Sequence, residues 1–371
     1  MAFSFGFSGD DIDIDDSEIN DDVPNVNLPD GMDASLPELV QAGKHDMDEW
    51  LSILPSQIFY NSLAISGTSL VISRREIFDI RTQLMAEDSA DHDNEELIAG
   101  LEQGDLKPRF YEGGFKTWEC SVDLAKLAAS DNSIIQSLGD SQTDVHIIEL
   151  GAGTAVPSLA LFALVLNKKE SEKGTISQRK THFTFADYNA AVLRLVTLPN
   201  LLLTWCKSRS PATTFPAAEQ EASQAQHEEQ ELDITPELIS DFKNDLMRRG
   251  ISISFISGAW SPEFVDLVFS GEGQGHARTL VLASETIYSP SSLTAFSETL
   301  LALLRGSTTA LMKSRALVAA KKVYFGVGGG VDEFLAVLNN VCADELEVRQ
   351  KVDVQSEGVG RVVLEVTPAA K

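Results

Sequence analysis

Apolar and polar positions follow two different periods from about residue 109 to the C-terminus. Short apolar or period-two runs predict strands, and longer runs with apolar residues three or four apart predict helices. Strands and helices follow one another in turn, which is typical of a parallel, doubly wound α/β sheet with helices on both faces. Ser121 is expected to cap the first helix, and Pro199 to kink or interrupt the helix that contains it. The expected strands are 145–150, 182–187, 251–257, 279–285 and 316–325, and the expected helices are 123–138, 155–166, 190–205, 236–250, 291–305 and 330–341.

The two ends of the alternating region have a different pattern. After the last helix, period-two runs at 345–354 and 360–366 are joined by a short polar turn and predict an antiparallel hairpin, the last part of a mostly parallel sheet of seven strands. Before the region, the apolar stretches 58–65 and 68–78 predict a hairpin or extended strands that cap the main domain.

Negative charge is concentrated in three segments. The formal net charge is -27, with 56 acidic and 29 basic residues. Segments 1–43, 87–106 and 210–242 hold 11, 8 and 8 acids and no Lys or Arg, so they account for the whole excess and the remainder is balanced. Like charges in stretches of low hydrophobicity bury too little surface to order the chain. We expect these segments to solvate the protein or to attract a basic protein partner, and we expect no direct binding of nucleic acid.

These patterns divide the chain into three parts. We expect an acidic, disordered N-terminal segment at 1–50, cap strands followed by an acidic loop at 51–108, and a main domain at 109–371 with a flexible acidic insertion at 210–235. No internal repeat is visible.

Cysteine usage and hydropathy indicate an intracellular protein that is not in a membrane. The three cysteines lie far apart, at 120, 206 and 342, and neither they nor the six histidines have the spacing of metal ligands, so we expect no metal. The longest apolar run, 159–166, is too short to cross a bilayer, and the acidic N-terminus lacks the features of a secretory signal.

The run 147–162 places an acid and two glycines between a strand and a helix. Glu149 lies near the end of the strand, and Gly151 and Gly153 allow a sharp turn that a ligand can approach closely. Val156 replaces the third glycine of a dinucleotide fingerprint, which disfavours a nicotinamide cofactor. The pattern alone fits either a nucleoside site or a structural strand-turn-helix.

Polar residues follow three further strands, whose carboxyl ends should meet at one rim of the sheet. Asp187 could accept hydrogen bonds from both ribose hydroxyls, or it could cap the next helix. Trp260 offers a flat face for adenine, or it could pack in the core. The fourth strand end reads Ser284-Glu285-Thr286-Ile287-Tyr288.

Five motifs occur in an order that resembles a known family. They are GGFKTWECSVDL, ELGAGTAVPSL, DYNAAVL, SETIYSP and AKKVYFGVGGG. The order resembles the seven-stranded S-adenosylmethionine-dependent methyltransferases, and within them the protein-histidine N-methyltransferases that modify a large-subunit ribosomal protein. The resemblance implies S-adenosylmethionine as cofactor and a pocket formed by Thr117, Trp118, Glu119, Cys120, Ser121, Glu149, Gly151, Gly153, Asp187, Tyr188, Asn189, Gly258, Ala259, Trp260 and Ser284.

Methyl transfer to imidazole needs a positioned ring more than a strong base. Neutral imidazole predominates near pH 7, so an acceptor bonded to one ring N–H would select the nitrogen that attacks. Glu285 is the candidate acceptor, and Tyr288 is the candidate residue to orient the ring. Glu285 could instead be an acid near a helix N-terminus, and Tyr288 a core residue. Lys116 and the glycine run 326–330 could meet the substrate backbone, or serve only as loop residues.

Three functions remain open from the sequence. The preferred one is a protein-histidine methyltransferase that acts on a basic ribosomal protein as a monomer in the cytoplasm and nucleus. The second is a lysine methyltransferase of the same fold, and the third is a non-catalytic escort of a ribosomal protein that has kept the cofactor fold.

Overall fold

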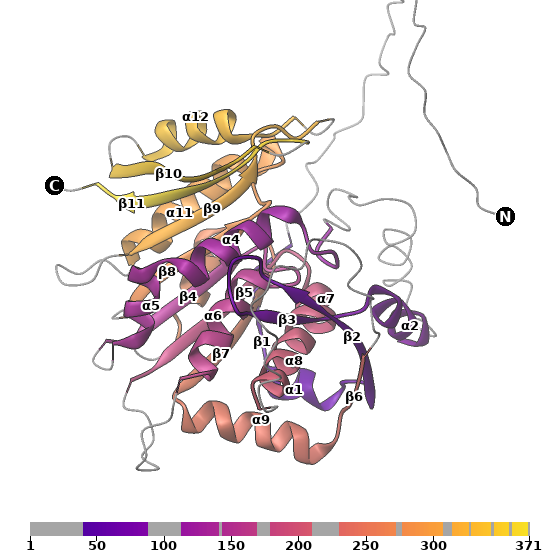
Figure 1. Ribbon diagram of the computed structural model, residues 1–371. Coiled ribbons are helices and arrows are strands. Elements are labelled where there is room, and N and C mark those ends of the chain that lie inside the picture. Colours follow the sequence, from indigo (N-terminus) through magenta and orange to yellow (C-terminus); the bar gives the residue numbers. More distant parts are fainter. Residues whose placement is uncertain are drawn as a thin grey trace, which may run out of the picture. The chain divides into compact units, whose positions relative to one another are not determined.

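An eight-stranded sheet forms the centre of the fold, in the order β1-β7-β5-β4-β8-β9-β11-β10 (Figure 1). The computed structural model describes residues 40–87, 113–140, 143–168, 179–209, 230–271, 277–306, 314–325, 328–342, 345–355 and 358–369. The strands of the sheet are β1 (Gly43–His45), β4 (Val145–Leu150), β5 (Thr181–Asp187), β7 (Ile251–Ser257), β8 (Arg278–Ser284), β9 (Arg315–Lys321), β10 (Leu346–Val354) and β11 (Arg361–Pro368).

The predicted doubly wound sheet is confirmed. Strands β4, β5, β7, β8 and β9 are parallel, and β10 and β11 form the predicted antiparallel hairpin beside β9. The order of the strands reverses between β4 and β8, the place where ligands bind in such sheets. The parallel pairing places Leu150 of β4 beside Ala186 of β5 and Ala283 of β8. The residues that follow these three therefore lie at the same edge of the sheet.

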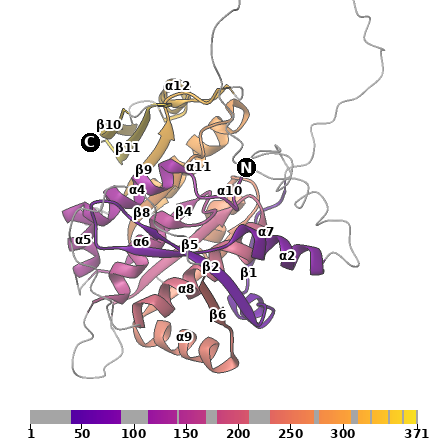
Figure 2. The same ribbon diagram turned by 45° about the vertical axis from the view of Figure 1, so that its right-hand side comes forward.

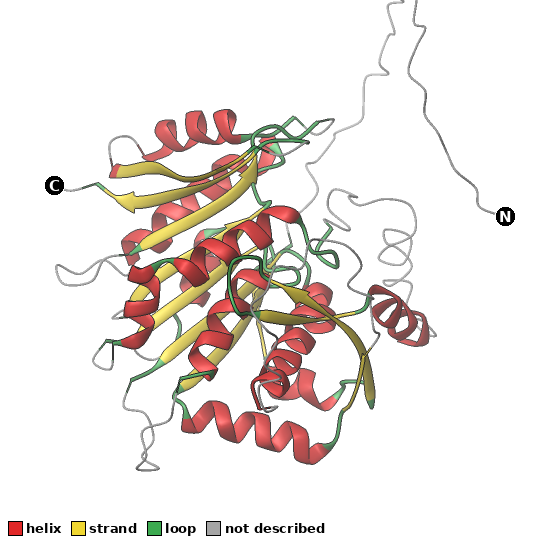
Figure 3. Cartoon of the chain, viewed as in Figure 1, coloured by secondary structure: helices red, strands yellow, loops and turns green. Residues whose placement is uncertain are grey.

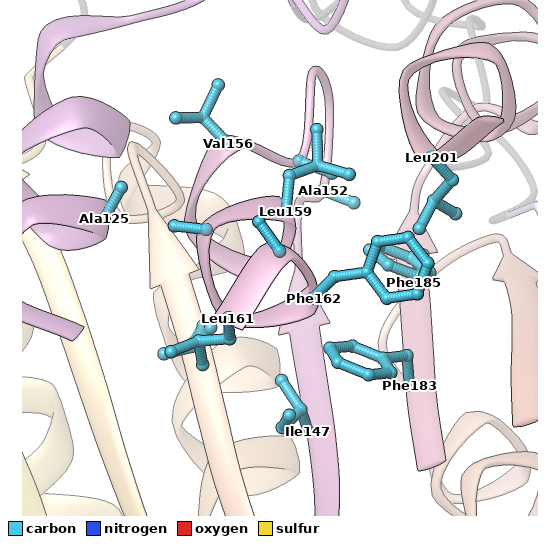
Figure 4. Close-up of a cluster of buried hydrophobic side chains, with 14 of the residues drawn as sticks. Ala125, Ile147, Ala152, Val156, Leu159, Leu161, Phe162, Phe183, Phe185 and Leu201 are labelled. Carbon is cyan, nitrogen blue, oxygen red and sulfur yellow. The ribbon is translucent and has the colours of Figure 1, made fainter. Parts of the chain in front are cut away.

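Helices cover both faces of the sheet (Figure 3). Neighbouring residues of β4 face opposite sides, so Ile147 joins one apolar core and Ile148 the other. On the first face, Phe162 meets the edge of Phe183 with ring centroids 5.6 Å apart (Figure 4). The first face carries α4 (Glu119–Ser130), α5 (Asn132–Gly139), α6 (Val156–Leu166) and α8 (Leu198–Arg209), and the second carries α10 (Pro262–Val268), α11 (Leu293–Gly306) and α12 (Val331–Cys342). A 3₁₀ turn, η3 (Pro290–Ser292), precedes α11.

A second sheet of three strands, β3-β2-β6, lies against α8 (Figure 2). Strands β2 (Gln57–Ala64) and β3 (Val71–Arg75) form the predicted hairpin, which is followed by α2 (Ile77–Glu87). Strand β6 (Gln230–Asp233) corrects the sequence analysis, because these residues were assigned to the flexible insertion. Edge pairing with β2 orders them, and α9 (Pro236–Arg248) follows. Residues 210–229 of the insertion lie outside the described residues.

Strand β1 and helix α1 (Met47–Ser52) fall within the range 1–50, which was expected to be disordered. Polar Gly43–His45 carry no strand pattern of their own, but they pair antiparallel with the edge strand β7. Trp50 is buried and its ring meets Phe255 of β7, which fixes α1 to the same edge. Residues 1–39 lie outside the described residues, as do most of the acidic loop residues between 87 and 106.

Two helix predictions are corrected. The helix expected over 123–138 is divided, because Asp131 ends α4 and its carboxylate accepts from the backbone N–H groups of Ser133 and Ile134 to cap α5. Ser121 is not a cap. Helix α4 begins earlier, with Trp118 at its N-cap, and the Ser121 hydroxyl donates to the Trp118 carbonyl within the first turn.

The α-helix expected over 190–205 is interrupted next to Pro199, as predicted, although the chain stays helical beyond this residue. Pro199 follows α7 (Ala190–Val192) and a π-helical turn, η1 (Leu193–Thr197), and lies near the start of α8. Proline has no N–H to donate to the carbonyl four residues earlier. That carbonyl belongs to Leu195, and it accepts a hydrogen bond of 3.0 Å from the buried guanidinium of Arg75 on β3. The small sheet thereby supplies a donor that the proline cannot.

Candidate active site

The glycine turn after β4 is closely packed. Gly151 and Gly153 have positive φ of 64° and 51°. A Cβ on Gly151 would lie 2.7 Å from the Thr286 methyl group, and one on Gly153 would lie 3.1 Å from the carbonyl oxygen of Gly114. Glycine is needed at both positions, because each combines a left-handed backbone with a close neighbour. The turn thus brings together the loop after β8 and the segment before α4.

Glu149 lies beneath this turn and is fully buried. Its Oε2 accepts a 3.0 Å hydrogen bond from the backbone N–H of Ser158 in the first turn of α6. Burial raises the pKa of Glu149 to about 8. Its Oε1 is buried with no hydrogen-bond partner among the described residues. The predicted cofactor residue is therefore placed to support the turn, with one polar atom unsatisfied.

Asp187 joins the end of β5 to the glycine turn. Its Oδ2 accepts from the backbone N–H of Gly153 at 3.0 Å, and its Oδ1 accepts from the N–H of Asn189 at 3.2 Å. The structure assigns the helix cap to Asn189 instead, whose side chain accepts from Ala191 N. Asp187 is thus directed at the turn, and Tyr188 beside it is half-buried.

The segment before α4 reaches the same turn. The Thr117 hydroxyl donates to that of Thr154 at 3.1 Å, and Trp118 Nε1 donates to the Gly113 carbonyl. Ser121 and Cys120 are buried in the first turn of α4. Glu119 is exposed and pairs with Lys321 at 3.4 Å. Lys116 lies in the turn that begins at Gly113.

The N-terminal strap, residues 40–45, covers the predicted element Gly258–Trp260. The backbone N–H of Ala259 donates to the Val40 carbonyl at 2.9 Å, and a Cβ on Gly258 would lie 2.6 Å from the Gln41 carbonyl oxygen. His45 Nε2 lies 2.7 Å from the Ser257 hydroxyl. No sequence signal pointed to this strap.

Trp260 packs its ring against Phe296 of α11, with centroids 5.1 Å apart. This contact agrees with the alternative of a packing residue, and its use as an adenine platform stays a prediction.

Glu285 follows β8 and adopts a left-handed backbone with φ of 56°. Its N–H donates to the Ala319 carbonyl of β9, and its Oε2 accepts from the Tyr324 hydroxyl at 2.5 Å. Ser284 precedes it at the end of β8. The ring of Tyr288 is half-buried and lies 6.3 Å from that of Tyr324, edge to face. Both predicted catalytic residues therefore meet a tyrosine that sequence reasoning did not single out.

Cys120 and Lys321 are two further residues that lie beside Glu285. The Cys120 thiol is buried next to the carboxylate, and burial followed by the Glu285 charge raises its pKa. Lys321 Nζ lies 3.9 Å from Glu285 Oε1 and 5.2 Å from the centre of the Trp118 ring. The end of β8 is thus linked to the start of α4.

The predicted residues consequently form two neighbouring groups rather than one. The first surrounds the glycine turn after β4 and includes Asp187, and the second surrounds Glu285 after β8. Gly151 connects them through its contact with Thr286. Such an arrangement can hold a nucleoside at the turn and a polar acceptor ring near the carboxylate.

Other features lie away from these groups. A polar hollow of about 240 Å³ is lined by Arg209, Arg248 and Arg249 with three neighbours on α9, and another of about 340 Å³ lies between α12 and the terminal hairpin. Within the described residues, no group of His, Cys, Asp and Glu has the arrangement of a metal site, and no helix is long and apolar enough to span a membrane.

Comparison with curated proteins finds near-full-length relatives. Histidine protein methyltransferase 1 of Saccharomyces cerevisiae is 32% identical over 98% of this chain and 98% of its own length. The protein of the same name from Schizosaccharomyces pombe is 34% identical over 98% of this chain and 92% of its own. The Bos taurus homologue is 29% identical over 71% of this chain and 57% of its own length. No protein-family model matches.

Solved structures show weaker likeness. TrmN from Thermus thermophilus has a TM-score of 0.30 at 12% identity, over 67% of this chain and 52% of that one. The N-terminal domain of EvdMO1 with SAH bound has a TM-score of 0.33 at 9% identity, over 79% of this chain and 98% of that one. Scores at this level carry no information on function.

Proposed function

The chain belongs to the histidine protein methyltransferase 1 family, and from this premise we propose that its substrate is a histidine of a large-subunit ribosomal protein. The observation that carries the family assignment is similarity over nearly the whole length of two fungal relatives. The chain is a protein-histidine methyltransferase. Two features support the finer proposal: its motifs resemble those of enzymes that modify the large subunit, and its net charge of -27 would attract a basic protein.

The cofactor is S-adenosylmethionine, and the residues around the glycine turn fit it. Asp187 carries a carboxylate beside Gly153, suited to accept from ribose hydroxyls. The missing Cβ atoms of Gly151 and Gly153 allow Thr286 and Gly114 to pack against the turn, which fixes the backbone that a ligand would approach. The orphaned Oε1 of Glu149 indicates a polar site that a ligand or water would complete. We propose that these four residues hold the nucleoside and the methionine part of the cofactor.

The cofactor supplies an electrophilic methyl group on a sulfonium. The chain's residues must bring an imidazole nitrogen into line with it and exclude water. We propose that Glu285 does this by accepting the N–H of the other ring nitrogen, so that the lone pair of the attacking nitrogen points at the methyl group. The same carboxylate would stabilise the imidazolium that forms and then receive its proton.

Tyr288 follows Glu285 by three residues, and we propose that it shares in orienting the imidazole ring. Its position on the loop after β8, with its ring edge to face against Tyr324, supports the proposal that it borders the imidazole. Tyr288 would then act through ring contact rather than proton transfer.

The test is transfer of labelled methyl groups by the purified full-length chain. Three substrates are offered separately: proteins extracted from the large ribosomal subunit, intact large subunits, and proteins extracted from the small subunit. The modified residue is then located by mass spectrometry. Label on a histidine of a large-subunit protein, lost when that histidine is replaced by alanine, is the expected result.

Two results would contradict the proposal. Label confined to small-subunit proteins would show that the substrate is not a large-subunit protein. Label that persists after the histidine is replaced would show that this histidine does not accept the methyl group. Glu285→Gln serves as the inactive control, so that label from a contaminating enzyme is recognised. We also propose that the protein acts as a monomer in the cytoplasm and nucleus, which gel filtration and microscopy of a tagged chain would test.

A further inference from the structure

The hydroxyl of Tyr324 is held at a fixed point beside Glu285. It donates to Glu285 Oε2 at 2.5 Å and accepts from the backbone N–H of Lys321 at 3.2 Å. Burial, followed by the neighbouring carboxylate, raises the pKa of Tyr324. The phenol is therefore protonated, and a hydrogen-bond donor, at neutral pH.

The loop that carries Tyr324 is closed on itself. The N–H of Tyr324 donates to the Gly329 carbonyl at 3.0 Å, and the N–H of Gly328 donates back to the Tyr324 carbonyl at 3.2 Å. A Cβ on Gly329 would lie 2.2 Å from the Tyr288 carbonyl oxygen, so this glycine is required by packing. Residues 326–327 lie outside the described residues. The loop after β9 thus positions Tyr324 against both Glu285 and Tyr288.

Glu285 is fixed at its backbone as well as at its side chain. A left-handed φ costs a non-glycine residue free energy, and it persists where the surroundings determine the conformation. Here the N–H of Glu285 is bonded to the carbonyl of Ala319 on β9, and its carboxylate is bonded to Tyr324. Tyr324 lies five residues after Ala319, in the loop that follows β9. Strand β9 and its loop therefore determine where the carboxylate points.

The two oxygens of this carboxylate differ. Tyr324 holds Oε2, whereas Oε1 is buried with no hydrogen-bond partner among the described residues, and Lys321 Nζ lies 3.9 Å from it. Lys321 is also engaged by Glu119 and by the Trp118 ring. Oε1 is consequently the oxygen that can take a strong donor.

We propose that Tyr324 is a positioning residue: it holds Oε2 of Glu285 so that Oε1 accepts the N–H of the substrate imidazole and selects the ring nitrogen that is methylated. This inference rests on the proposed role of Glu285. Tyr324 gives up no proton in the reaction and touches neither the methyl group nor the attacking nitrogen. Its contribution is to restrict the carboxylate to one rotamer before substrate arrives.

The experiment compares Tyr324→Phe, Glu285→Gln and the double variant in the full chain, with Tyr60→Phe on β2 as a matched control. The measurements are kcat, KM for the protein substrate, the dissociation constant of S-adenosylmethionine, and the ratio of Nδ1- to Nε2-methylhistidine in the product. We expect Tyr324→Phe to lower kcat roughly 10-fold, the effect of one hydrogen bond to a charged group, with cofactor affinity within about 2-fold of wild type.

Two further results are expected if Tyr324 acts through Glu285. Tyr324→Phe should yield a mixture of the two methylhistidine isomers, which a purely structural role would not produce. The double variant should be no slower than Glu285→Gln alone, because coupled residues are not additive. Tyr60→Phe should behave as wild type.

Additive losses, an unchanged isomer ratio, or a loss of cofactor binding in Tyr324→Phe would overturn the inference. If Glu285→Gln is slow while Tyr324→Phe matches wild type, only the role of Tyr324 fails. If Glu285→Gln itself is fully active, the proposed role of Glu285 fails too.

Discussion

The carboxylate of Asp187 accepts a hydrogen bond of 3.0 Å from the backbone N–H of Gly153, joining the end of β5 to the turn after β4. The other side of the turn is bonded too, because Thr197 donates to the Gly153 carbonyl and Asn200 donates to that of Thr154. Asn200 in turn accepts from the backbone N–H of Arg75. The turn is therefore held in place by the sheet, the π-helical turn and the small sheet, which reduces the ordering cost of ligand binding.

Replacing Asp187 with alanine is expected to weaken cofactor binding. The ribose hydroxyls would lose a charged acceptor and Gly153 N would lose its partner, so the dissociation constant should rise by an amount equivalent to about 1–3 kcal/mol. Titration calorimetry with S-adenosylmethionine measures this. Asp266→Ala, at an exposed position of α10, is the matched control. An unchanged affinity in Asp187→Ala would remove the residue from the cofactor site.

Replacing Glu285 with glutamine is expected to separate catalysis from cofactor binding. Glutamine is similar in shape but carries no charge to stabilise the imidazolium, so kcat should fall roughly 100-fold or more. The cofactor dissociation constant should stay within about 2-fold, because the proposed contact of Glu285 is with substrate. Glu298→Gln, on the exposed side of α11, is the control. If Glu285→Gln abolished cofactor binding instead, the residue would belong to the cofactor site.

The parts of this fold that sequence predicts are those with local signals. Strand β4 has the bounds predicted for it, 145–150, because an apolar run ends at a glycine turn. The N-terminal strap had no such signal, since Gly43–His45 form a strand only through pairing with β7. The role of Tyr324 also depends on contacts distant in sequence: 39 residues separate it from Glu285. Periodicity therefore predicts the sheet and its rim, whereas side-chain pairs across the rim require the folded structure.

The buried carboxyl of Glu149 is expected to make stability depend on pH. Its pKa is raised from 4.5 to about 8 in the folded state, so the folded protein holds a proton that the unfolded chain releases between these values. The raised pKa of Glu149 therefore contributes to the free energy of unfolding. This contribution is complete below about pH 4.5 and is lost as pH rises through 8. The slope is at most about 1.4 kcal/mol per pH unit. Glu149→Gln should remove it.

Urea unfolding between pH 6.5 and 8, without cofactor, tests this prediction. Buried His146 has the opposite effect, because burial lowers its pKa from 6.5 to about 3 and its contribution is lost as pH falls below 6.5. Above pH 6.5, His146 therefore no longer changes the free energy of unfolding with pH. Wild type should lose unfolding free energy across the window while Glu149→Gln stays nearly level. Parallel profiles for the two proteins would show that Glu149 does not carry the dependence.

The N-terminal strap is expected to support the cofactor site. Removal of residues 1–45 takes away the Val40 carbonyl that accepts from Ala259 and the strand that pairs with β7. The loop at Gly258–Trp260 would lose this support, and cofactor affinity should fall several-fold. Removal of residues 1–39 keeps the strap and is the matched control. Equal affinities in the two truncated proteins, both folded by circular dichroism, would contradict a role for the strap.

The acidic segment itself is expected to act on substrate encounter. Residues 1–39 carry 11 acids and no Lys or Arg, and the described chain begins at Val40, which is bonded to Ala259 beside the end of β7. Attraction of a basic protein by such charge is screened within about 10 Å at 0.1 M salt. Removing residues 1–39 should therefore lower kcat/KM for the protein substrate several-fold at low salt and have little effect at high salt. The cofactor dissociation constant should not change. A loss of kcat/KM that is equal at low and high salt would show that attraction by charge is not its cause, because screening acts on charge and leaves specific contacts largely intact.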